Sequence, residues 1–204
     1  MTNADVLQRR FPGRRAQLKR EILQQALGCF NEHGIEGTTI DMLKARCDTS
    51  VGAIYHHFGN KDGLLAALFF TAQDDQQALM QAYLQQVDDL RGGIAALVYS
   101  YVDWVTAQPD WARFQYQAHA AVSKGPQASE LALRNLERGR QLAEWLAQRN
   151  DSGQLREHPA ELRASLIIGQ SESYCRAWLS GRATTAPSAY REQLAEAAWH
   201  SVSC

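Results

Sequence analysis

The segment from Thr38 to Lys61 restricts the possible folds of this 204-residue chain more than any other part. Apolar residues recur at helical spacing on both sides of a short interruption, with Ile40, Leu43 and Cys47 before it and Ile54 and Phe58 after it. Thr38 with Asp41 is a start signal for the first helix, and Ser50 can cap the second by accepting a backbone N–H. The segment therefore predicts two short helices, packed together and joined by a turn of about three residues.

The second predicted helix carries no carboxylate, which is unusual for a surface that is merely solvated. Tyr55, His56 and His57 lie on it beside Gly52 and Ala53. Hydroxyl and imidazole groups can donate to phosphate oxygens, and small residues let a helix backbone approach base edges. The layout is that of a helix-turn-helix, whose second helix enters the major groove. The alternative is an ordinary helical hairpin that these side chains only cover, since exposed Tyr and His are common.

Basic residues are concentrated at the N-terminal end. Six of them precede or open an amphipathic helix: Arg9, Arg10, Arg14, Arg15, Lys19 and Arg20. The apolar face of that helix consists of Leu23, Ala26, Leu27 and Phe30, and the helix stops at Gly34. Residues 1–61 contain nine Lys or Arg and six Asp or Glu. Residues 62–204 contain twelve Lys or Arg and sixteen Asp or Glu, so that the whole chain has 21 basic and 22 acidic residues. This distribution indicates a nucleic-acid-binding module joined to an acidic remainder. Residues 1–8 are expected to be a flexible tail.

The stretch from Ile22 to Leu65 resembles the N-terminal domain of the tetracycline-repressor (TetR) family of one-component regulators. The resemblance covers a little over a fifth of the chain. It rests on several motifs together: the helix ending at Phe30 to Gly34, the G-x-x-G-T-T motif from Gly34 to Thr39, Ser50, the stretch from Gly52 to Phe58, and Lys61. It implies an all-α fold, in which an N-terminal three-helix DNA-binding domain with a helix-turn-helix precedes a larger helical ligand-binding and dimerisation domain.

The resemblance also implies roles for individual residues. Thr39 would touch a phosphate, and Tyr55 and Lys61 would clamp phosphates, Lys61 being helped by the positive N-terminal end of the next helix. Val51, Gly52, Ala53 and His56 would face the groove, while Leu43, Ile54 and Phe58 would be core. The full set of predicted DNA-binding residues is Arg14, Arg15, Thr39, Lys44, Ser50, Val51, Gly52, Ala53, Tyr55, His56 and Lys61.

Two positions depart from the family pattern. Asp48-Thr49 stands where Gly-Val is usual, so a left-handed turn position falls to Asp, which tolerates it less well than Gly. Lys44 replaces a small residue and could add a phosphate contact. Val51, Gly52 and Ala53 offer no bidentate group to a base, so the operator sequence cannot be deduced from them.

The chain length suits one small DNA-binding domain, placed at residues 1–60, and a larger domain at residues 61–204. The pattern beyond residue 60 is helical throughout. The first expected helix starts after Asn60 and ends near Gly92-Gly93. Five more helices are expected at Ile94 to Ala107, Asp110 to Ser123, Ala128 to Asn150, Pro159 to Leu179 and Pro187 to Val202. The first of these helices would connect the two domains.

Several classes of protein are disfavoured by what the sequence lacks. Cys29, Cys47, Cys175 and Cys204 have neither C-x-x-C spacing nor a histidine at metal-ligand distance, so no metal, cofactor or disulfide framework is predicted. Cys29 and Cys47 are expected in the core and Cys204 at the surface. No nucleophile elbow, phosphate-binding glycine loop or H-E-x-x-H motif appears, so an enzyme is not predicted. No signal peptide and no membrane-spanning run are found, and a cytoplasmic location is expected.

The last two predicted helices mix small and large residues in a way that allows close helix packing. The predicted homodimer interface consists of Leu166, Gly169, Ser173 and Ala177 on one helix and Leu194 and Ala198 on the other. Such a pair could form a four-helix bundle with its copy across a two-fold axis. The alternative is that the same residues pack within one chain.

Aromatic residues with few charges between them are concentrated in the middle helices. They suit a site for a small apolar or aromatic effector, predicted at Tyr101, Trp104, Trp111, Phe114, Tyr116, His119 and Trp145. The alternative is a helical core rich in tryptophan, which residue by residue is the better explanation.

Together these observations predict a dimeric repressor that binds a palindromic DNA operator and is released when an effector binds the C-terminal domain. The effector would shift the helix that begins at Lys61, and a differential of about 3 kcal/mol would change operator affinity roughly 150-fold. The alternative from a different class is a helical, dimeric ligand- or partner-binding module that does not act through DNA.

Overall fold

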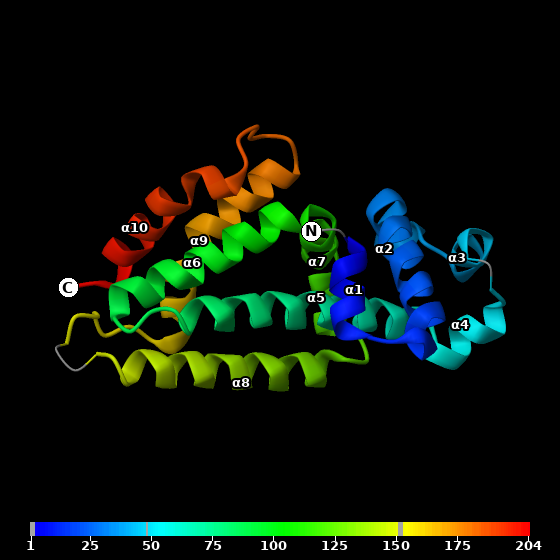
Figure 1. Ribbon diagram of the computed structural model, residues 1–204, viewed down its shortest axis with the longest axis horizontal. Helices are drawn as coiled ribbons and strands as arrows, with labels where there is room; N and C mark the ends of the chain where they lie inside the picture. The colour runs from blue at the N-terminus through cyan, green and yellow to red at the C-terminus, as the bar shows by residue number, and fades with distance from the viewer. Residues whose placement is uncertain (1–2, 48, 151–152) are drawn as a thin grey trace. The chain divides into compact units, whose positions relative to one another are not determined.

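The computed structural model describes residues 3–47, 49–150 and 153–204 (Figure 1). The described residues are helical, apart from connecting segments and an isolated antiparallel bridge between Leu155 and Ser203. The helices are α1 Asn3–Arg10, η1 Arg14–Ala16, α2 Gln17–Gly37, α3 Ile40–Arg46, α4 Val51–Phe58, α5 Lys61–Leu84, α6 Leu90–Ala107, α7 Pro109–Lys124, α8 Ala128–Ala147, α9 Ala160–Leu179, η2 Pro187–Tyr190 and α10 Arg191–Val202, where η denotes a 3₁₀ helix. The all-α fold expected from the sequence is confirmed.

The chain divides into two compact units. The first contains the residues up to Asp75 together with Gln108–Ala132, and the second contains Gln76–Ala107 together with Leu133–Cys204. Helices α5 and α8 therefore contribute residues to both units. The functional boundary predicted after residue 60 lies at the start of α5, whereas the compact units divide that helix further along; the boundary stays a prediction.

Helix α2 forms the centre of the first unit. Its apolar face, which includes Ile22, Leu23 and Phe30, is buried, and α7 packs against it with the Phe30 and Phe114 ring centroids 5.6 Å apart. The regular part of α2 ends at Gly34, whose φ of 73° lies in the left-handed region that favours glycine. The helix end predicted at Gly34 is thus confirmed.

The N-terminal segment does not behave as the expected tail. Residues 3–10 form α1, and Val6 and Leu7 are completely buried against the first unit. Two apolar side chains followed within three residues by Arg9 and Arg10 are a weak signal in the sequence. Their burial contributes roughly 1.5–3 kcal/mol each and offsets the entropy lost on ordering the segment. The expectation of a flexible tail is wrong for the described residues of this segment.

The helix expected to run from Asn60 to Gly92-Gly93 is two helices. Helix α5 ends at Leu84 and α6 begins at Leu90, so the two glycines lie inside α6. Gly93 is required there by packing, because a Cβ on it would lie 2.1 Å from Cη2 of Trp145 on α8. The glycine pair was interpreted as a helix end, but Gly93 instead allows an indole ring to approach a helix backbone.

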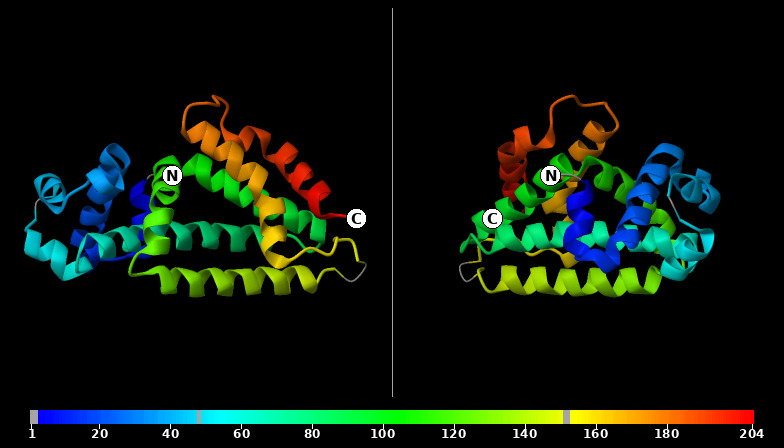
Figure 2. Two further views of the ribbon diagram at one scale, coloured as in Figure 1. Left: turned by 180° about the vertical axis from the view of Figure 1, so that it is seen from behind. Right: turned by 45° about the vertical axis from the view of Figure 1, so that its right-hand side comes forward.

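Helices α6, α9 and α10 pack together in the second unit (Figure 2). Helix α9 buries Ile167, Ser171 and Cys175, which repeat every four residues and so lie on one face. The carboxylate of Asp103 on α6 links this unit further, since it accepts 2.8 Å hydrogen bonds from Tyr83 and from Arg191. These contacts fix the positions of α5, α6 and α10 within the unit.

The remaining predicted helices agree with the structure within a few residues. Helix α7 starts at Pro109 and α9 follows Pro159, as the two prolines indicated. Helix α8 ends at Ala147, and the last predicted helix begins with a 3₁₀ turn. Within the described residues, none of the helices combines the length and the apolar character needed to cross a membrane.

Candidate nucleic-acid interface

Two side-chain caps define the helix-turn-helix. The Thr39 hydroxyl accepts a 3.2 Å hydrogen bond from the backbone N–H of Met42 at the start of α3. The Ser50 hydroxyl accepts one of 3.1 Å from the N–H of Ala53 at the start of α4. Each cap satisfies a backbone donor that has no partner inside its helix. The cap predicted at Ser50 is confirmed.

The start signal assigned to Thr38 belongs to its neighbour. Thr38 is buried, and its hydroxyl donates to the carbonyl oxygens of Cys29 at 3.1 Å and Gly34 at 2.8 Å. Its side chain is therefore committed to the end of α2 and does not cap α3. The correction shifts the start by one residue and leaves the two helices where they were predicted.

The two helices of the hairpin bury one face each and leave the other open. Leu43 of α3 and Ile54 of α4 are buried, as predicted, while Phe58 is half-buried. On the opposite face of α4, Gly52 and His56 are exposed and Tyr55 retains 47% of its surface. A Cβ on Gly52 would meet only Ser50 Oγ, at 3.7 Å, so the backbone is open to a close approach there.

The predicted DNA-binding residues can now be placed. Eight of them are exposed: Arg14, Arg15, Thr39, Lys44, Ser50, Gly52, Tyr55 and His56. Val51, Ala53 and Lys61 are half-buried. The Lys61 amino group donates to the carbonyl of Glu36 at 3.4 Å, which holds it near the end of α2. The turn position at Asp48 lies outside the described residues.

The basic residues around α1 and α2 differ in what they do. Arg9 and Arg10 pair with Asp75 and Asp74, at 2.7 and 3.1 Å. Arg20 donates to the carbonyls of Phe11 and Gly13 and so holds the segment before α2. These three arginines stabilise the first unit. The neighbouring Arg14 and Arg15 on η1 are exposed, and the sequence alone does not distinguish them from the others.

Lys19 lies against apolar surface rather than in open solvent. Its Nζ is 4.4 Å from the centroid of the Phe11 ring. Burial lowers the pKa of Lys19, and the nearby charge of Arg10 lowers it further. The lysine therefore packs the N-terminal segment onto α2 through a cation–π contact.

An ion pair joins the hairpin to α2. Arg46 at the end of α3 donates to both carboxylate oxygens of Glu32, with Nη1 to Oε1 at 2.9 Å. This hydrogen bonding lowers the pKa of the Glu32 carboxyl. A bidentate pair fixes both the distance and the orientation of the two helices. It also neutralises an acidic group that would otherwise repel phosphate near α3.

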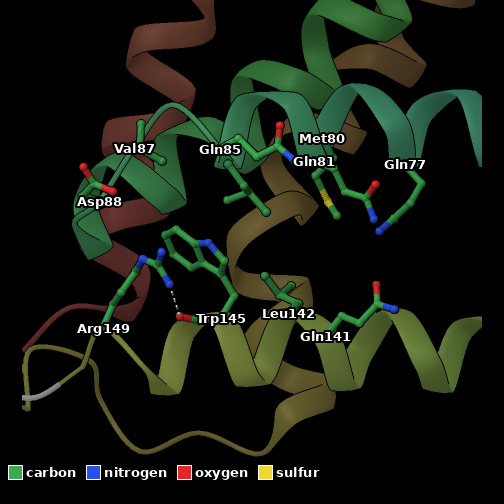
Figure 3. A pocket seen from close by; sticks show the side chains of 11 residues that line it. Gln77, Met80, Gln81, Gln85, Val87, Asp88, Gln141, Leu142, Trp145 and Arg149 are labelled. Atoms are coloured by element: carbon green, nitrogen blue, oxygen red, sulfur yellow. Dashed lines mark hydrogen bonds between the residues drawn. The ribbon is translucent and has the colours of Figure 1, made fainter.

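A cavity of about 490 Å³ lies in the second unit between the end of α5 and the end of α8 (Figure 3). We call it the Trp145 cavity. Its apolar surface comes from Met80, Leu84, Val87, Leu142 and Trp145, and its polar surface from Gln77, Gln81, Gln85, Asp88, Gln141 and Arg149. The Arg149 guanidinium lies 4.0 Å from the centroid of the Trp145 ring and donates to the Trp145 carbonyl at 3.3 Å.

Of the seven predicted effector residues, Trp145 alone lines this cavity. Trp104, Trp111 and Phe114 are buried in helix packing, which agrees with the alternative of a tryptophan-rich core. Tyr101 and Tyr116 are half-buried, and His119 is exposed with its ring 6.2 Å from that of Phe69. The glutamines were missed. Their signal in the sequence was the repeat of Gln77, Gln81 and Gln85 on one helical face.

Some residues of the predicted dimer interface lie on an open helix face, and others are buried within the chain. On α9, Leu166, Gly169 and Ala177 are half-buried and Ser173 is exposed, and a Cβ on Gly169 would meet nothing within 4 Å. The neighbouring Leu162, which was not in the predicted set, retains 45% of its surface. This face lies opposite the buried residues of α9. On α10, Leu194 is half-buried, whereas Ala198 is 1% exposed and packs inside the protomer. Ala198 therefore does not belong to an open face, because the fold already covers it.

The thiols are placed largely as expected. Cys29 is buried, Cys47 is half-buried and Cys204 is exposed. Cys175 is also buried, and burial raises its pKa to about 12. Such a thiol stays protonated and unreactive at neutral pH. No three His, Cys, Asp or Glu side chains of the described residues come together as metal ligands would.

The fold and the exposed face of α4 define an all-α protein with an N-terminal helix-turn-helix. Residues 22–68 match the family described as bacterial regulatory proteins, tetR family. The repressor AcnR of Corynebacterium glutamicum is 40% identical over 76 residues, which are 36% of this chain and 39% of the relative. The similarity to the tetR family is therefore carried by residues 22–68.

Solved structures of low sequence identity share the fold over about nine tenths of the chain. A regulatory protein of the tetR family from Rhodococcus RHA1 is 21% identical with a TM-score of 0.78, covering 92% of this chain and 98% of the other. The transcriptional regulator FadR from Bacillus subtilis, solved in complex with stearoyl-CoA, is 14% identical with a TM-score of 0.75, covering 90% and 98%. The sequence relative AcnR, by contrast, is matched over about two fifths of its length.

Proposed function

We propose that this protein is a transcriptional regulator that represses genes by binding double-stranded DNA through α4. The observation that carries the proposal is the exposed, carboxylate-free face of α4, capped at Ser50 and lying within the residues that match the tetR family. AcnR, which is similar to this chain over 76 residues, is named a transcriptional repressor. The proposal places the protein in the cytoplasm, where its DNA target lies.

In this proposal the protein makes two kinds of contact with DNA: contacts to phosphates, which position the protein, and contacts to base edges, which recognise the sequence. Thr39, Lys44, Tyr55 and Lys61 would bind phosphates, and Arg14 and Arg15 would reach the backbone beside the groove. Gly52 and His56 would face base edges, with Val51 and Ala53 at the rim. These groups contact DNA without a bidentate Arg, Asn or Gln, so thymine methyl groups and DNA shape would contribute to selectivity.

The regulator would act as a homodimer on a palindromic operator. One hairpin offers few phosphate contacts, and two-fold pairing doubles them. The open face of α9, formed by Leu162, Leu166, Gly169 and Ser173, supports a dimer because small residues allow a second helix to come close. Its partner would be the same face of a second copy.

A small effector would bind in the Trp145 cavity and release the DNA. The cavity volume is within the range of small-molecule sites, and its lining combines apolar side chains with a few polar ones. A protein of the same fold, FadR, was solved with stearoyl-CoA bound. Trp145 and Leu142 present an apolar wall, and the four glutamines would orient polar groups of the effector.

Helix α5 provides the route from the cavity to the DNA. It begins at Lys61, which is a predicted phosphate contact, and its last residues line the Trp145 cavity. An effector that binds better to one position of α5 than to another would shift the population between them. Two recognition helices whose separation changes would no longer fit successive major grooves.

The proposal is tested by selecting, from a random double-stranded DNA library, the molecules that the purified protein retains. The retained DNA is sequenced, and the strongest binder is titrated with salt. We expect a two-fold symmetric motif and an affinity that falls steeply with salt, because each phosphate contact releases counterions. Folded protein that enriches no motif would contradict the proposal and favour a ligand- or partner-binding module.

A further inference from the structure

The Trp145 cavity is elongated, and its two ends differ in chemistry. Its lining extends from Gln77 on α5 and Gln141 on α8 to Asp88 and Arg149, which follow the ends of those two helices. The step from Gln141 to Arg149 corresponds to about 12 Å along a helix. Figure 3 shows Asp88 and Arg149 at one end of the cavity, and Gln77 and Gln141 at the other. An apolar middle therefore separates a charged end from an amide end.

Arg149 brings to the cavity a positive group that no carboxylate neutralises. Its guanidinium stacks on the Trp145 ring and donates once, to the Trp145 carbonyl at 3.3 Å. Among the described residues it has no ion partner. Arg140 on α8 shows the ordinary alternative, since it pairs with Glu137 at 2.8 Å and with Glu144 at 2.6 Å. The stacking therefore holds a guanidinium in place while N–H groups remain available to a carboxylate.

Asp88 brings the opposite charge to the same end of the cavity. It is exposed, and within the part of the chain that the structure describes it accepts no hydrogen bond and has no ion partner. The adjacent Asp89 instead accepts a 2.8 Å hydrogen bond from the N–H of Gly92 and so caps α6. Asp88 and Arg149 line one end of the cavity without pairing with each other, so both charges are available to a ligand.

These two charges select the net charge of the ligand. A phosphate ester with several negative charges would be repelled by Asp88, and a simple cation would be repelled by Arg149. An α-amino acid suits both groups, because its carboxylate and its ammonium are attached to the same carbon. Its side chain would lie against Leu84, Leu142 and Trp145 in the apolar middle. We propose that the Trp145 cavity binds an α-amino acid with a large apolar side chain, the carboxylate on Arg149 and the ammonium on Asp88.

This inference names the chemical class of the effector and rests on the proposed role of the cavity as the effector site. The head group of the ligand would bridge the segment after α5 and the segment after α8. Amino-acid binding is measured on the protein without DNA. A protein that binds no amino acid could still select an operator, and a protein that selects no operator could still bind an amino acid, so the two failures are distinguishable.

The test is a calorimetric titration of the full chain with L-tryptophan, L-phenylalanine and L-leucine. Two analogues of each amino acid lack either the ammonium or the carboxylate; for L-tryptophan they are indole-3-propionate and tryptamine. Arg149→Met and Asp88→Asn remove the two protein charges with little change in side-chain size. Their matched controls are Arg156→Met and Glu157→Gln, because both residues are exposed and lie outside the lining of the cavity. Thermal unfolding of each variant establishes that it is folded.

We expect at least one of the three amino acids to bind saturably, with one molecule per chain, and more tightly than either of its analogues. Arg149→Met should weaken this binding roughly tenfold or more, because it removes charge-assisted hydrogen bonds in a half-buried site. Asp88→Asn should weaken it roughly threefold, since an exposed carboxylate contributes less. The two control variants should bind like the original protein.

Three results would each overturn the proposal: no binding of any of the three amino acids, equal binding of an amino acid and one of its analogues, or equal binding by a cavity variant and its matched control. Asp88 lies at the surface, so Asp88→Asn tests the proposal even if Arg149→Met does not fold.

Discussion

The α3–α4 hairpin and the Trp145 cavity are assembled by different kinds of contact. The hairpin depends on residues close in sequence: Ser50 caps a backbone N–H three residues later, and Leu43 and Ile54, eleven residues apart, are both buried. The cavity depends on Trp145 of α8 resting on Gly93 of α6, which is 52 positions away in the sequence. Local rules therefore determine the proposed DNA-binding face, whereas the proposed effector site depends on packing between distant helices.

The largest expected difference between the two regions concerns buried apolar contacts. Leu43→Ala should destabilise the protein by about 2–5 kcal/mol, because Leu43 is fully buried between the two short helices. Leu142→Ala in the cavity wall should cost roughly 1 kcal/mol or less, since that side chain is only partly buried. Urea unfolding of the two variants measures both losses. Equal losses would contradict the distinction between a packed hairpin and an open cavity.

Adding one methyl group at Gly93 tests whether the Trp145 cavity depends on packing between distant helices. Gly93→Ala should cost about 1–3 kcal/mol, because its Cβ would overlap the Trp145 ring and force it to move. Gly139→Ala is the matched control on α8, where a Cβ meets nothing within 4 Å. That change should stabilise the helix by about 0.5–1 kcal/mol. A stabilising Gly93→Ala in thermal unfolding would show that Trp145 does not rest on the glycine.

The phosphate contacts are tested without disturbing the hairpin core. The double variant Tyr55→Phe with Lys61→Ala should bind the selected operator roughly 10- to 100-fold more weakly, with a shallower salt dependence. Lys124→Ala removes an exposed lysine from the end of α7 and should leave binding unchanged. Fluorescence anisotropy at several salt concentrations measures both effects. If the two variants bind alike, the assignment of Tyr55 and Lys61 as phosphate contacts is wrong.

Loss of one cap should have a smaller effect. Ser50→Ala removes the acceptor for the N–H of Ala53 and should destabilise the protein by about 1 kcal/mol. Ser165→Ala on α9 serves for comparison, because that hydroxyl donates to a carbonyl already used in the helix. Its effect should be close to zero. Equal unfolding midpoints for the two variants would argue against the cap.

The smallest effect concerns pH. Arg46 lowers the pKa of Glu32 in the folded protein, so the pair stabilises it above the pKa of an unfolded glutamate, about 4.3. That stabilisation is lost as the pH falls through the lower, folded pKa. Glu32→Gln should therefore be less stable than the original protein at pH 7, and the difference should shrink at acidic pH. A difference independent of pH between 7 and 3 would contradict an ionic contribution.

The sequence predicted the hairpin well because the relevant contacts are short-ranged. It erred by one residue at Thr38, since two adjacent threonines could each cap α3 and only the fold shows that Thr38 is bonded to Cys29 and Gly34. The aromatic cluster was less informative. A cluster such as Trp104, Trp111 and Phe114 has the residue types of a ligand site as well as those of a core. The burial of these side chains results from tertiary packing, which a local sequence pattern does not indicate.

The Trp145 cavity shows the same limit from another direction. Gln77, Gln81 and Gln85 look like ordinary surface residues in a helical sequence, and Gln81 and Gln85 are exposed in the structure. Their place in the lining of the cavity depends on α8, which comes much later in the chain. Gly93 was read as a helix end for the same reason: its role is set by Trp145, a residue from another helix.

The most direct test of DNA recognition by α4 is a hydroxyl-radical and methylation-protection footprint of the full chain on its selected operator. A dimer presenting two α4 helices predicts two protected major-groove segments, related by a two-fold axis and centred about one helical turn apart or a multiple of it. Tyr55→Phe with Lys61→Ala should weaken both segments together. A single protected segment, or protection confined to the minor groove, would contradict recognition by paired α4 helices.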